Sequence, residues 1–468
     1  MKNKIFSYLE SDKTLIIIMT LCLTSLSVMP FLIEGSFHDS QRLISIFIIL
    51  ILSYKTVYTG AIAKTSTYII LALAISGFIS SVLSIIPYWS MIELLLLISL
   101  VILIVNFQVE NYSFLAHKIT LLFCFLQLIY IFRALINYSI VLIRSDPLDI
   151  NMIIDGFSNL RFYGQFISWT LPFIVAYTCV NKDKNNKYLL FTTMLSTGLV
   201  LLSGTRAFFV GMLFSIVSTY FFVPTLWKSY TLAILKVLLG GMVFYITTLF
   251  IIPFYLNIDN SLLLNSSINR DLTNSSGRSE IWLTTLKVFI EYPYFGIGPM
   301  MLALDGIYSG VAHPHNMFLQ ILSEWGVIFS LIFLTILYKM ISSWKNLIQQ
   351  NAFIRAPIAL GITASISSAF MVSLVDGIIV MPVSIIYLGI IVGLGSAVWK
   401  HWTPQETSIK LSYSLKILLY TPIILLTIIS AQQWLNLEQF DTNASRPRFW
   451  QHGTLAKPSH IEDLPINW

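Results

Sequence analysis

Residues 91–105 read MIELLLLISLVILIV, an apolar run interrupted only by Glu93 and Ser99. Runs approaching the roughly 20 residues that a helix needs to cross a bilayer recur along almost the whole chain. An open sheet cannot satisfy its backbone in lipid, and the runs are too long and too uniformly apolar for barrel strands. We count about thirteen of them, centred near Thr24, Ile49, Ala74, Ile98, Leu128, Leu171, Met194, Phe214, Val243, Ile328, Ser365, Gly389 and Ile424.

The composition excludes an ordinary soluble protein. The chain is 56% hydrophobic and 11% charged, with a mean hydropathy of +0.79, whereas a soluble domain carries about 25% charged residues. We therefore predict an all-α, polytopic integral membrane protein with about 12 to 13 transmembrane helices. The first run follows MKNKIFSYLESDK without a small-residue cleavage site and is expected to be a retained signal anchor. The three cysteines fall inside apolar runs, which predicts buried thiols and neither a disulfide framework nor a metal site.

Charge predicts the orientation. With the N-terminus inside, the inner segments include NKDKNNK (181–187), the turn KMISSWK (339–345) and KHWTPQETSIK (400–410), which is a positive-inside bias. Sixteen of the eighteen lysines are then inner, with Lys287 and Lys457 the exceptions, whereas nine of the ten arginines are outer, Arg355 being the exception. Outer arginines oppose the topogenic rule, and their planar fork of donors suits phosphate or carboxylate. The alternative for any one arginine is interfacial snorkelling.

The long outer loop, from about Pro253 to Pro314, contains the first candidate site. Its Asn- and Ser-rich piece NSSINRDLTNSSGR is predicted to be irregular, and SEIWLTTLKVFIEY (279–292) is predicted to be a short helix lying at the membrane interface. Arg278 precedes this helix beside Gly277, so free amides and a guanidinium would favour an anion there. The alternative is a capping turn with an incidental charge.

The stretch 312–326, AHPHNMFLQILSEWG, contains two of the seven histidines. We expect Pro314 to allow a helix to begin, which puts His315 at the mouth of a span. Asn316, Gln320 and Glu324 follow at spacings of four and share one helical face, and a polar stripe in a membrane helix indicates function. Histidine exchanges protons near neutral pH, so His315 is a candidate base, and His313 is more typical of a loop hydrogen bond.

A second arginine lies in a very short outer connection. The turn LLSGTRAFF (201–209) holds Arg206 at the membrane surface, facing either headgroups or a ligand held there. An anionic ligand or leaving group bound at this surface would need its negative charge stabilised. The outer segments contain no DxD pair or acidic cluster for a metal, so we predict no metal and no cofactor, and the arginines are the candidates for this role.

The order of SGTR, a large loop with GRSEIW and FGIGP, and then HPHNMFLQILSEWG resembles the O-antigen ligase and polymerase superfamily, including bacterial protein O-oligosaccharyltransferases. The resemblance extends from about Asn159 to Gly326. Its most specific element is His, a small polar residue, nine positions and then Gly, met by His315, Asn316 and Gly326. The family usually places Gly, Thr or Tyr where this chain has Phe329, a difference that concerns local helix packing more than chemistry.

The resemblance implies a GT-C-like helical fold, a glycan donor carried on undecaprenyl diphosphate, and a periplasmic acceptor hydroxyl. On this reading Arg206 and Arg278 bind the donor diphosphate and His315 is catalytic. Supporting residues are Asn316, Gln320, Glu324, Arg161, Gln165 and His313; Arg161 and Gln165 stand at polar positions of the span beginning FSNLRFYGQ. Asp376, at the outer end of the eleventh span, would orient a partner or, more typically, cap a helix.

The expected organisation has four parts: transmembrane helices 1–9 (1–252), a periplasmic loop with catalytic elements (253–315), helices 10–13 (316–431) and a periplasmic C-terminal tail (432–468). The predicted location is the bacterial inner membrane, with the site on the periplasmic face. The acceptor is left open between lipid A core, which we favour, a protein such as a pilin, and a growing glycan. A flippase or transporter is the alternative from another class of protein. It stays open because the charged residues Arg133 and Glu93 lie within or near predicted spans. Nucleic acid is not an expected partner.

Overall fold

The computed structural model describes residues 12–29, 37–58, 61–107, 111–157, 159–181, 186–267, 277–304, 307–308, 311–350, 357–402, 408–410 and 413–435. The predicted C-terminal tail therefore lies outside the described residues from position 436 onward. The helices are α2 (Asp12–Val28), α3 (Phe37–Tyr58), α4 (Lys64–Val82), α5 (Pro87–Asn106), α6 (Tyr112–Arg144), α7 (Ile150–Ile153), α8 (Arg161–Val180), α9 (Asn186–Leu202), α10 (Arg206–Phe222), α11 (Pro224–Ile246), α12 (Ile252–Leu256), α13 (Ser261–Ser267), α14 (Arg278–Glu291), α15 (Met317–Gln350), α16 (Pro357–Ser373), α17 (Pro382–Trp402) and α18 (Tyr413–Leu435). A π-helical turn (Thr247–Ile251) joins α11 to α12, Met301–Ala303 forms a 3-10 turn, and the strands are β1 (Ala61–Ala63) and β2 (Ser408–Lys410).

Every one of the thirteen predicted centres falls in a helix, and the prediction of a helical, polytopic membrane protein is confirmed. Within the described residues, six helical segments are long and apolar enough to cross a membrane. Four shorter apolar helices accompany them. The number of helices that cross stays a prediction. The six long segments are Pro87–Val105, Tyr112–Arg144, Pro224–Leu256, Met317–Gln349, Pro382–His401 and Lys416–Gln433.

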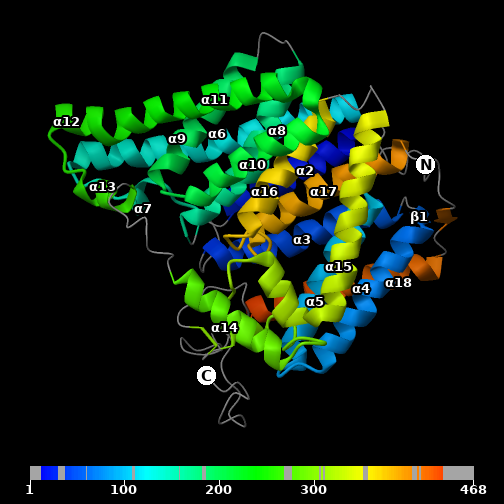
Figure 1. The fold of residues 1–468 in the computed structure, drawn as a ribbon. Coiled ribbons are helices and arrows are strands. Elements are labelled where there is room, and N and C mark those ends of the chain that lie inside the picture. The colour runs from blue at the N-terminus through cyan, green and yellow to red at the C-terminus, as the bar shows by residue number, and fades with distance from the viewer. Residues whose placement is uncertain are drawn as a thin grey trace.

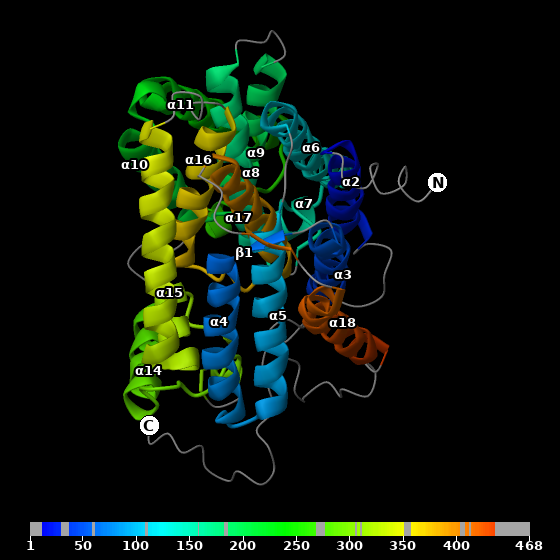
Figure 2. The ribbon, with the colours of Figure 1, turned by 90° about the vertical axis from the view of Figure 1, so that its right-hand side faces the viewer.

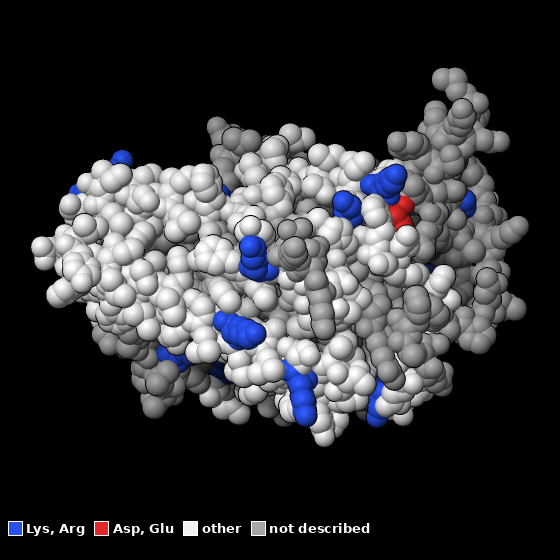
Figure 3. All heavy atoms as spheres, turned by 90° about the horizontal axis from the view of Figure 1, so that it is seen from above, with Lys and Arg blue, Asp and Glu red and all other residues white. Residues whose placement is uncertain are grey.

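The surface of these helices is apolar, as expected for a protein dissolved in lipid. Large side chains that a soluble protein would bury are exposed, such as Phe132, Leu239 and Leu418. Figure 3 shows one face on which uncharged side chains predominate, Lys and Arg are scattered, and acidic side chains are scarce over the described part. The polar atoms of the backbone are satisfied inside the helices, so this surface can face hydrocarbon.

The helices form two groups that meet along α8 and α17. In Figure 1, α6, α9 and α11 run side by side, whereas α4, α5 and α15 are inclined to them. Figure 2 shows α4, α5 and α15 standing together, with α14 at the lower end of α15. The central helix α8 packs against α6, α9, α10, α11, α16 and α17 and is buried along most of its length.

One end of the molecule gathers segments that the charge pattern places inside. β1 pairs with β2 in antiparallel register, Ala61 opposite Lys410, which brings the α3–α4 and α17–α18 connections together. The carboxylate of Asp12 accepts a hydrogen bond from the amide of Asn111 at 2.6 Å, so α2 and α6 begin at the same end. We call this the lysine end. The two short strands are the only departure from an all-α fold within the described residues.

The opposite end carries Arg161, Arg206, Arg278 and His315, and we call it the arginine end. Here Ser90 at the start of α5 donates to the Pro299 carbonyl at 2.8 Å. Arg42, 2% exposed near the start of α3, donates to the Val380 carbonyl at 3.3 Å. The two-sided arrangement agrees with alternating passage of the chain through a bilayer.

Two predicted segments differ from the structure. The turn expected at KMISSWK does not exist, because α15 continues through it to Gln350. Residues 265–267 of the piece expected to be irregular belong to α13, whereas 268–276 lie outside the described residues. The division of the chain at Pro253 falls inside α12, whose helix ends at Leu256, and the four-part organisation stays a prediction.

The interfacial helix is present as α14, one residue longer at its start than predicted. Thr285 and Val288 are fully buried against the protein, whereas Leu283, Leu286 and Ile290 are exposed along the opposite face. After the helix, the amide of Ile328 in α15 donates to the carbonyl of Tyr294 at 3.4 Å, which holds the end of the α14 segment against α15. A helix with one apolar face open beside a membrane span suits the membrane interface.

Candidate active site

His315 occupies the last turn of chain before α15. Its φ is +53°, a left-handed conformation that costs an L-residue other than glycine or asparagine roughly 1–2 kcal/mol. Asn316 follows as the cap of the helix, because its Oδ1 accepts from the amide of Leu319 at 3.1 Å. Its Nδ2 donates to the Leu374 carbonyl at 3.1 Å. Asn316, and not Pro314, therefore begins the helix, and it also ties His315 to the segment after α16.

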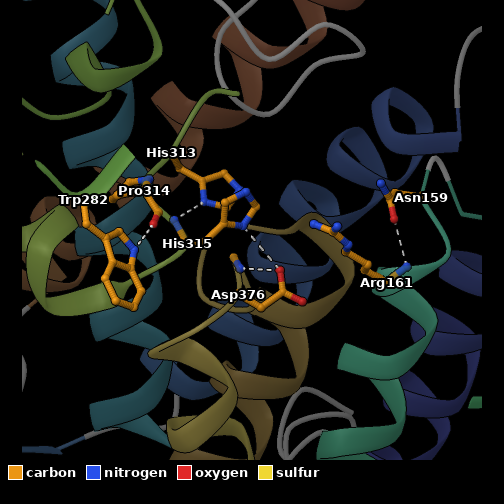
Figure 4. Close-up of polar contacts among 8 residues, drawn as sticks. Asn159, Arg161, Trp282, His313, Pro314, His315 and Asp376 are labelled. Atoms are coloured by element: carbon orange, nitrogen blue, oxygen red, sulfur yellow. Dashed lines mark hydrogen bonds and ion pairs between the residues drawn. The ribbon is translucent and has the colours of Figure 1, made fainter. Parts of the chain in front are cut away.

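That segment places a carboxylate against the imidazole. Nδ1 of His315 lies 3.6 Å from Oδ1 of Asp376, with 14% of the histidine side chain and 4% of the aspartate side chain exposed. The separation is an ion-pair distance longer than a normal hydrogen bond. Oδ1 of Asp376 also accepts from the amide of Gly377 at 2.7 Å. Asp376 is thus directed at His315 (Figure 4) and does not act only as the helix cap that the sequence suggested.

His313 packs against the same loop. A Cβ added to Gly377 would lie 2.3 Å from Cε1 of His313, so only glycine permits this approach. The two imidazole rings meet edge to face with centroids 4.1 Å apart, and Nδ1 of His313 accepts the amide of His315 at 3.2 Å. Because a backbone N–H can only donate, Nδ1 of His313 carries no proton in this arrangement.

The first turn of α8 lies across from this pair. Figure 4 shows the Arg161 side chain extending from α8 toward Asp376 and the histidines. Its amide donates to Oδ1 of Asn159 at 2.9 Å, which fixes the start of the helix. One turn further, Gln165 is 1% exposed, and neither of its side-chain polar atoms has a hydrogen-bond partner among the described residues. A buried amide of this kind is costly and points to a polar partner that binds there.

Three helices at the arginine end begin on an arginine: α8 on Arg161, α10 on Arg206 and α14 on Arg278. The residues before α10 and α14, Thr205 and Gly277, provide no side-chain cap. A cation in the first helical turn is opposed by the helix dipole, which favours anions there. Positive dipole ends and guanidinium groups therefore coincide, and this combination is suited to binding phosphate.

Contacts next to Arg206 and Arg278 join their helices to α8 and to the histidine loop, respectively. Arg206 is exposed after the three-residue turn Ser203–Thr205, and Thr205 packs against Gly164, where an added Cβ would be 2.3 Å from its Cγ2. Arg278 is half-buried, and Trp282 one turn later donates from Nε1 to the Pro314 carbonyl at 2.9 Å. The two arginines are thus at the same end of the molecule, at the starts of α10 and α14.

Asn316, Gln320 and Glu324 follow one another at successive turns, Asn316 as the cap of α15 and the other two within it. Nε2 of Gln320 donates to Oε2 of Glu324 at 3.3 Å, and both side chains are buried. Gly326 interrupts α15 directly after the stripe, with φ 78° and ψ 176°. The part after this kink, Val327–Gln350, is by itself about 36 Å long at 1.5 Å per residue. The stripe therefore occupies a separate helical segment at the arginine end.

The kink is held by the FGIGP segment. The amides of Ile297 and Gly298 donate to the carbonyls of Ser323 and Glu324 at 2.9 and 3.0 Å, and the amide of Val327 donates to the Pro293 carbonyl at 2.9 Å. A Cβ on Gly326 would lie 2.3 Å from the Tyr294 carbonyl oxygen. Phe329, which departs from the family pattern, is buried and stacks on Trp325 with centroids 4.5 Å apart. Its ring therefore packs locally and lies away from the histidines.

Arg133 is one of the two residues on which the transporter alternative rests, and it has a partner in the structure. Its Nη2 lies 2.5 Å from Oδ1 of Asp155, in the connection that precedes α8. Glu93 is 9% exposed and sits in α5, one turn after Ser90, which contacts Pro299. The ion pair with Asp155 accounts for the charge of Arg133 without a transport pathway.

The fold and the site together define a polytopic helical membrane protein. Its His315–Asp376 pair lies at the end of the molecule where three helices begin on an arginine. Residues 191–334 match the protein-family model for O-antigen ligase (Wzy_C). This match supports the resemblance to the O-antigen ligase superfamily over those residues. The matched segment includes Arg206, Arg278 and His315, whereas Arg161, Gln165 and Asp376 lie outside it. No curated protein matches the chain.

The sequence favoured a helix cap for Asp376 over the orienting of a partner, and it gave Trp282 no role. The signal for Trp282 was its place in GRSEIW, four residues after Arg278 and hence on the same helical face. Asp376 had no comparable signal, because its nearness to His315 depends on how α15 and α16 return to one end of the molecule.

Proposed function

We propose that this protein is a glycosyltransferase of the O-antigen ligase type, which moves a preassembled glycan from undecaprenyl diphosphate to an acceptor hydroxyl. The observation that carries the proposal is the His315–Asp376 pair, 3.6 Å apart, beside three helices that begin on Arg161, Arg206 and Arg278. A base and a set of cations are the two chemical parts that such a transfer requires. The family match supports a role of this general kind.

In the proposed step the acceptor oxygen attacks the anomeric carbon of the donor glycan. A carbon–oxygen bond forms there as the bond from that carbon to the phosphate oxygen breaks. Nε2 of His315 takes the hydroxyl proton, and the electron pair of the broken bond leaves with undecaprenyl diphosphate. Asp376 on Nδ1 holds the ring and stabilises the imidazolium that forms. Attack opposite the leaving group inverts the anomeric configuration.

Arg206 and Arg278 bind the diphosphate in this proposal. Arginine presents two parallel donors to phosphate oxygens, and the uncapped starts of α10 and α14 add free amides. The charge that develops on the leaving diphosphate is then neutralised without a metal or other cofactor. Arg161, which points at the histidine pair in Figure 4, adds a third cation between the two groups.

The supporting residues have more limited roles. Asn316 ties His315 to the Asp376 segment, and Gln320 and Glu324 pair with each other beneath it. Gln165, buried without a partner among the described residues, is a candidate to contact a sugar hydroxyl. His313 accepts the His315 amide and packs on Gly377.

The proposed location is the bacterial inner membrane, with the arginine end at the periplasmic face. Lipid A core is the leading acceptor, a protein such as a pilin the second, and the end of a growing glycan, as in a Wzy-type polymerase, the third. All three present a hydroxyl, so the site chemistry is the same for each. Deleting the gene and asking whether lipopolysaccharide, a pilin-like protein or glycan chain length loses its sugar distinguishes them.

A flippase for lipid-linked glycans is the alternative of a different class. Purified protein in detergent, mixed with a polyprenyl-diphosphate oligosaccharide and each acceptor in turn, should form a new glycosidic bond if the protein is a transferase. Transport leaves covalent bonds unchanged. Absence of product with all three acceptors, together with donor movement across proteoliposomes, would contradict the proposed function.

A further inference from the structure

The peptide group between Pro314 and His315 is held at both of its polar atoms. Nε1 of Trp282 donates to the Pro314 carbonyl oxygen at 2.9 Å, and the His315 amide donates to Nδ1 of His313 at 3.2 Å. A trans peptide directs its C=O and N–H to opposite sides, so the two bonds fix the plane between them. Figure 4 shows this arrangement next to the His315–Asp376 contact.

The rotation that these bonds restrict sets the direction of the His315 side chain. The proline ring fixes φ of Pro314, so the peptide plane turns mainly through ψ of Pro314 and φ of His315. That φ is +53°, in a region that residues with a Cβ seldom occupy unless their surroundings enforce it. Releasing the plane would let His315 relax to a negative φ and turn its ring from Asp376.

The indole that holds the plane is itself well anchored. Trp282 is in the second turn of α14, where the carbonyl of Thr285 accepts from Oγ of Ser323 at 2.8 Å and the hydroxyls of Thr285 and Tyr308 lie 2.6 Å apart. Trp282 follows Arg278 by four residues, so both lie on one face of the helix. The helix start that carries Arg278 and the peptide that carries His315 are therefore fixed to each other.

We propose that Trp282 and His313 are positioning residues that together hold His315 in its strained conformation facing Asp376. The role of His315 as a base rests on the proposed function, whereas the holding of the peptide is a structural statement that is testable without activity. Trp282 also sets the distance between the cation at the start of α14 and the imidazole. A loss of about one ångström in such alignment is expected to cost up to about 100-fold in rate.

The first test is amide hydrogen exchange in Trp282→Phe, which keeps an aromatic ring and removes the N–H donor. The control is Trp344→Phe, because Trp344 donates in the same way to Oγ1 of Thr363 at 2.9 Å, in α15 toward the lysine end. Pro314 has no amide hydrogen, so a peptide covering 311–316 reports His315 with few other amides. We expect faster exchange there in Trp282→Phe alone. Unchanged exchange in a folded Trp282→Phe protein would overturn the proposal.

The second test removes the other bond. An asparagine side chain can accept from the amide two residues on, so His313→Asn retains an acceptor for His315, whereas His313→Leu has a similar shape and lacks one. We expect 311–316 to exchange faster in His313→Leu than in His313→Asn. Equal exchange in the two variants would contradict the role of His313. If Trp282→Phe unfolds, exchange would be fast throughout the protein. The comparison of His313→Leu with His313→Asn would then still test whether the peptide between Pro314 and His315 is held.

The kinetic readout separates positioning from general damage. With a polyprenyl-diphosphate oligosaccharide as donor, Trp282→Phe should lower kcat about tenfold or more and leave the donor KM within about twofold, while Trp344→Phe keeps both. A kcat within twofold of the wild-type value would argue against positioning. An inactive wild-type protein would count against the proposed function instead, and hydrogen exchange would still decide whether the peptide is held.

Discussion

Nδ1 of His315 and Oδ1 of Asp376 lie 3.6 Å apart although 61 positions separate them in the chain. The aspartate side chain is 4% exposed, and burial of a carboxylate is tolerated when a partner and a hydrogen-bond donor compensate it. Gly377 is the donor and His315 is the partner. The pair places Nδ1 of the imidazole against the protein, and in the proposed function Nε2 is the nitrogen that faces the acceptor.

Replacing Asp376 by Asn should reduce turnover without loss of donor binding. An amide retains the size of the carboxylate but does not stabilise an imidazolium, so we expect kcat to fall about 10- to 100-fold with the donor KM within about twofold. Asp259→Asn, at an exposed aspartate of the arginine end, is the matched control and should leave kcat unchanged. Steady-state kinetics of both purified variants measures this.

Substituting His315 by Ala should abolish transfer while folding and donor binding are largely kept. The imidazole is 14% exposed, so its removal leaves a small cavity, and alanine bears a similar cost of the positive φ, so the net effect on stability is small. Product formation and donor binding by titration provide the measurement. Full activity in this variant would remove the proposed base.

Lysine at positions 206 and 278 should weaken donor binding although the charge is kept. Lysine binds as a point charge and lacks the bidentate fork, so Arg206→Lys and Arg278→Lys should each raise the donor Kd about 5- to 20-fold, equivalent to about 1–2 kcal/mol. Arg144→Lys is the control, since Arg144 is exposed at the end of α6. Equal donor affinity in all three variants would show that bidentate hydrogen bonds from Arg206 and Arg278 do not contribute to diphosphate binding.

The helices were predictable because apolar runs of spanning length have few alternatives in lipid, and all thirteen centres fall in helices. The presence of α14 followed from its apolar pattern and the proline after it, and the alignment of Asn316, Gln320 and Glu324 followed from the 3.6-residue period. The contact of His315 with Asp376 was not predictable, because no local pattern specifies which helix ends meet. The kink at Gly326 was not predictable for a similar reason, because it depends on how the FGIGP segment packs against α15.

Two glycine substitutions should therefore act in opposite directions. At Gly326, φ is 78° and a Cβ would lie 2.3 Å from the Tyr294 carbonyl oxygen, so Gly326→Ala combines a backbone strain of about 1–3 kcal/mol with a clash against main chain that cannot move aside. At Gly395 in α17 the nearest atom would be Ile362 Cγ2 at 3.5 Å, an ordinary contact. Alanine there should stabilise the helix by up to about 1 kcal/mol.

Thermal unfolding in detergent should give a lower midpoint for Gly326→Ala and an unchanged or higher midpoint for Gly395→Ala. A Gly326→Ala protein as stable as the wild type would mean that the segment holding the kink does not dock as described, and Glu324 would then lose the carbonyl contact with Gly298 that fixes the polar stripe below His315.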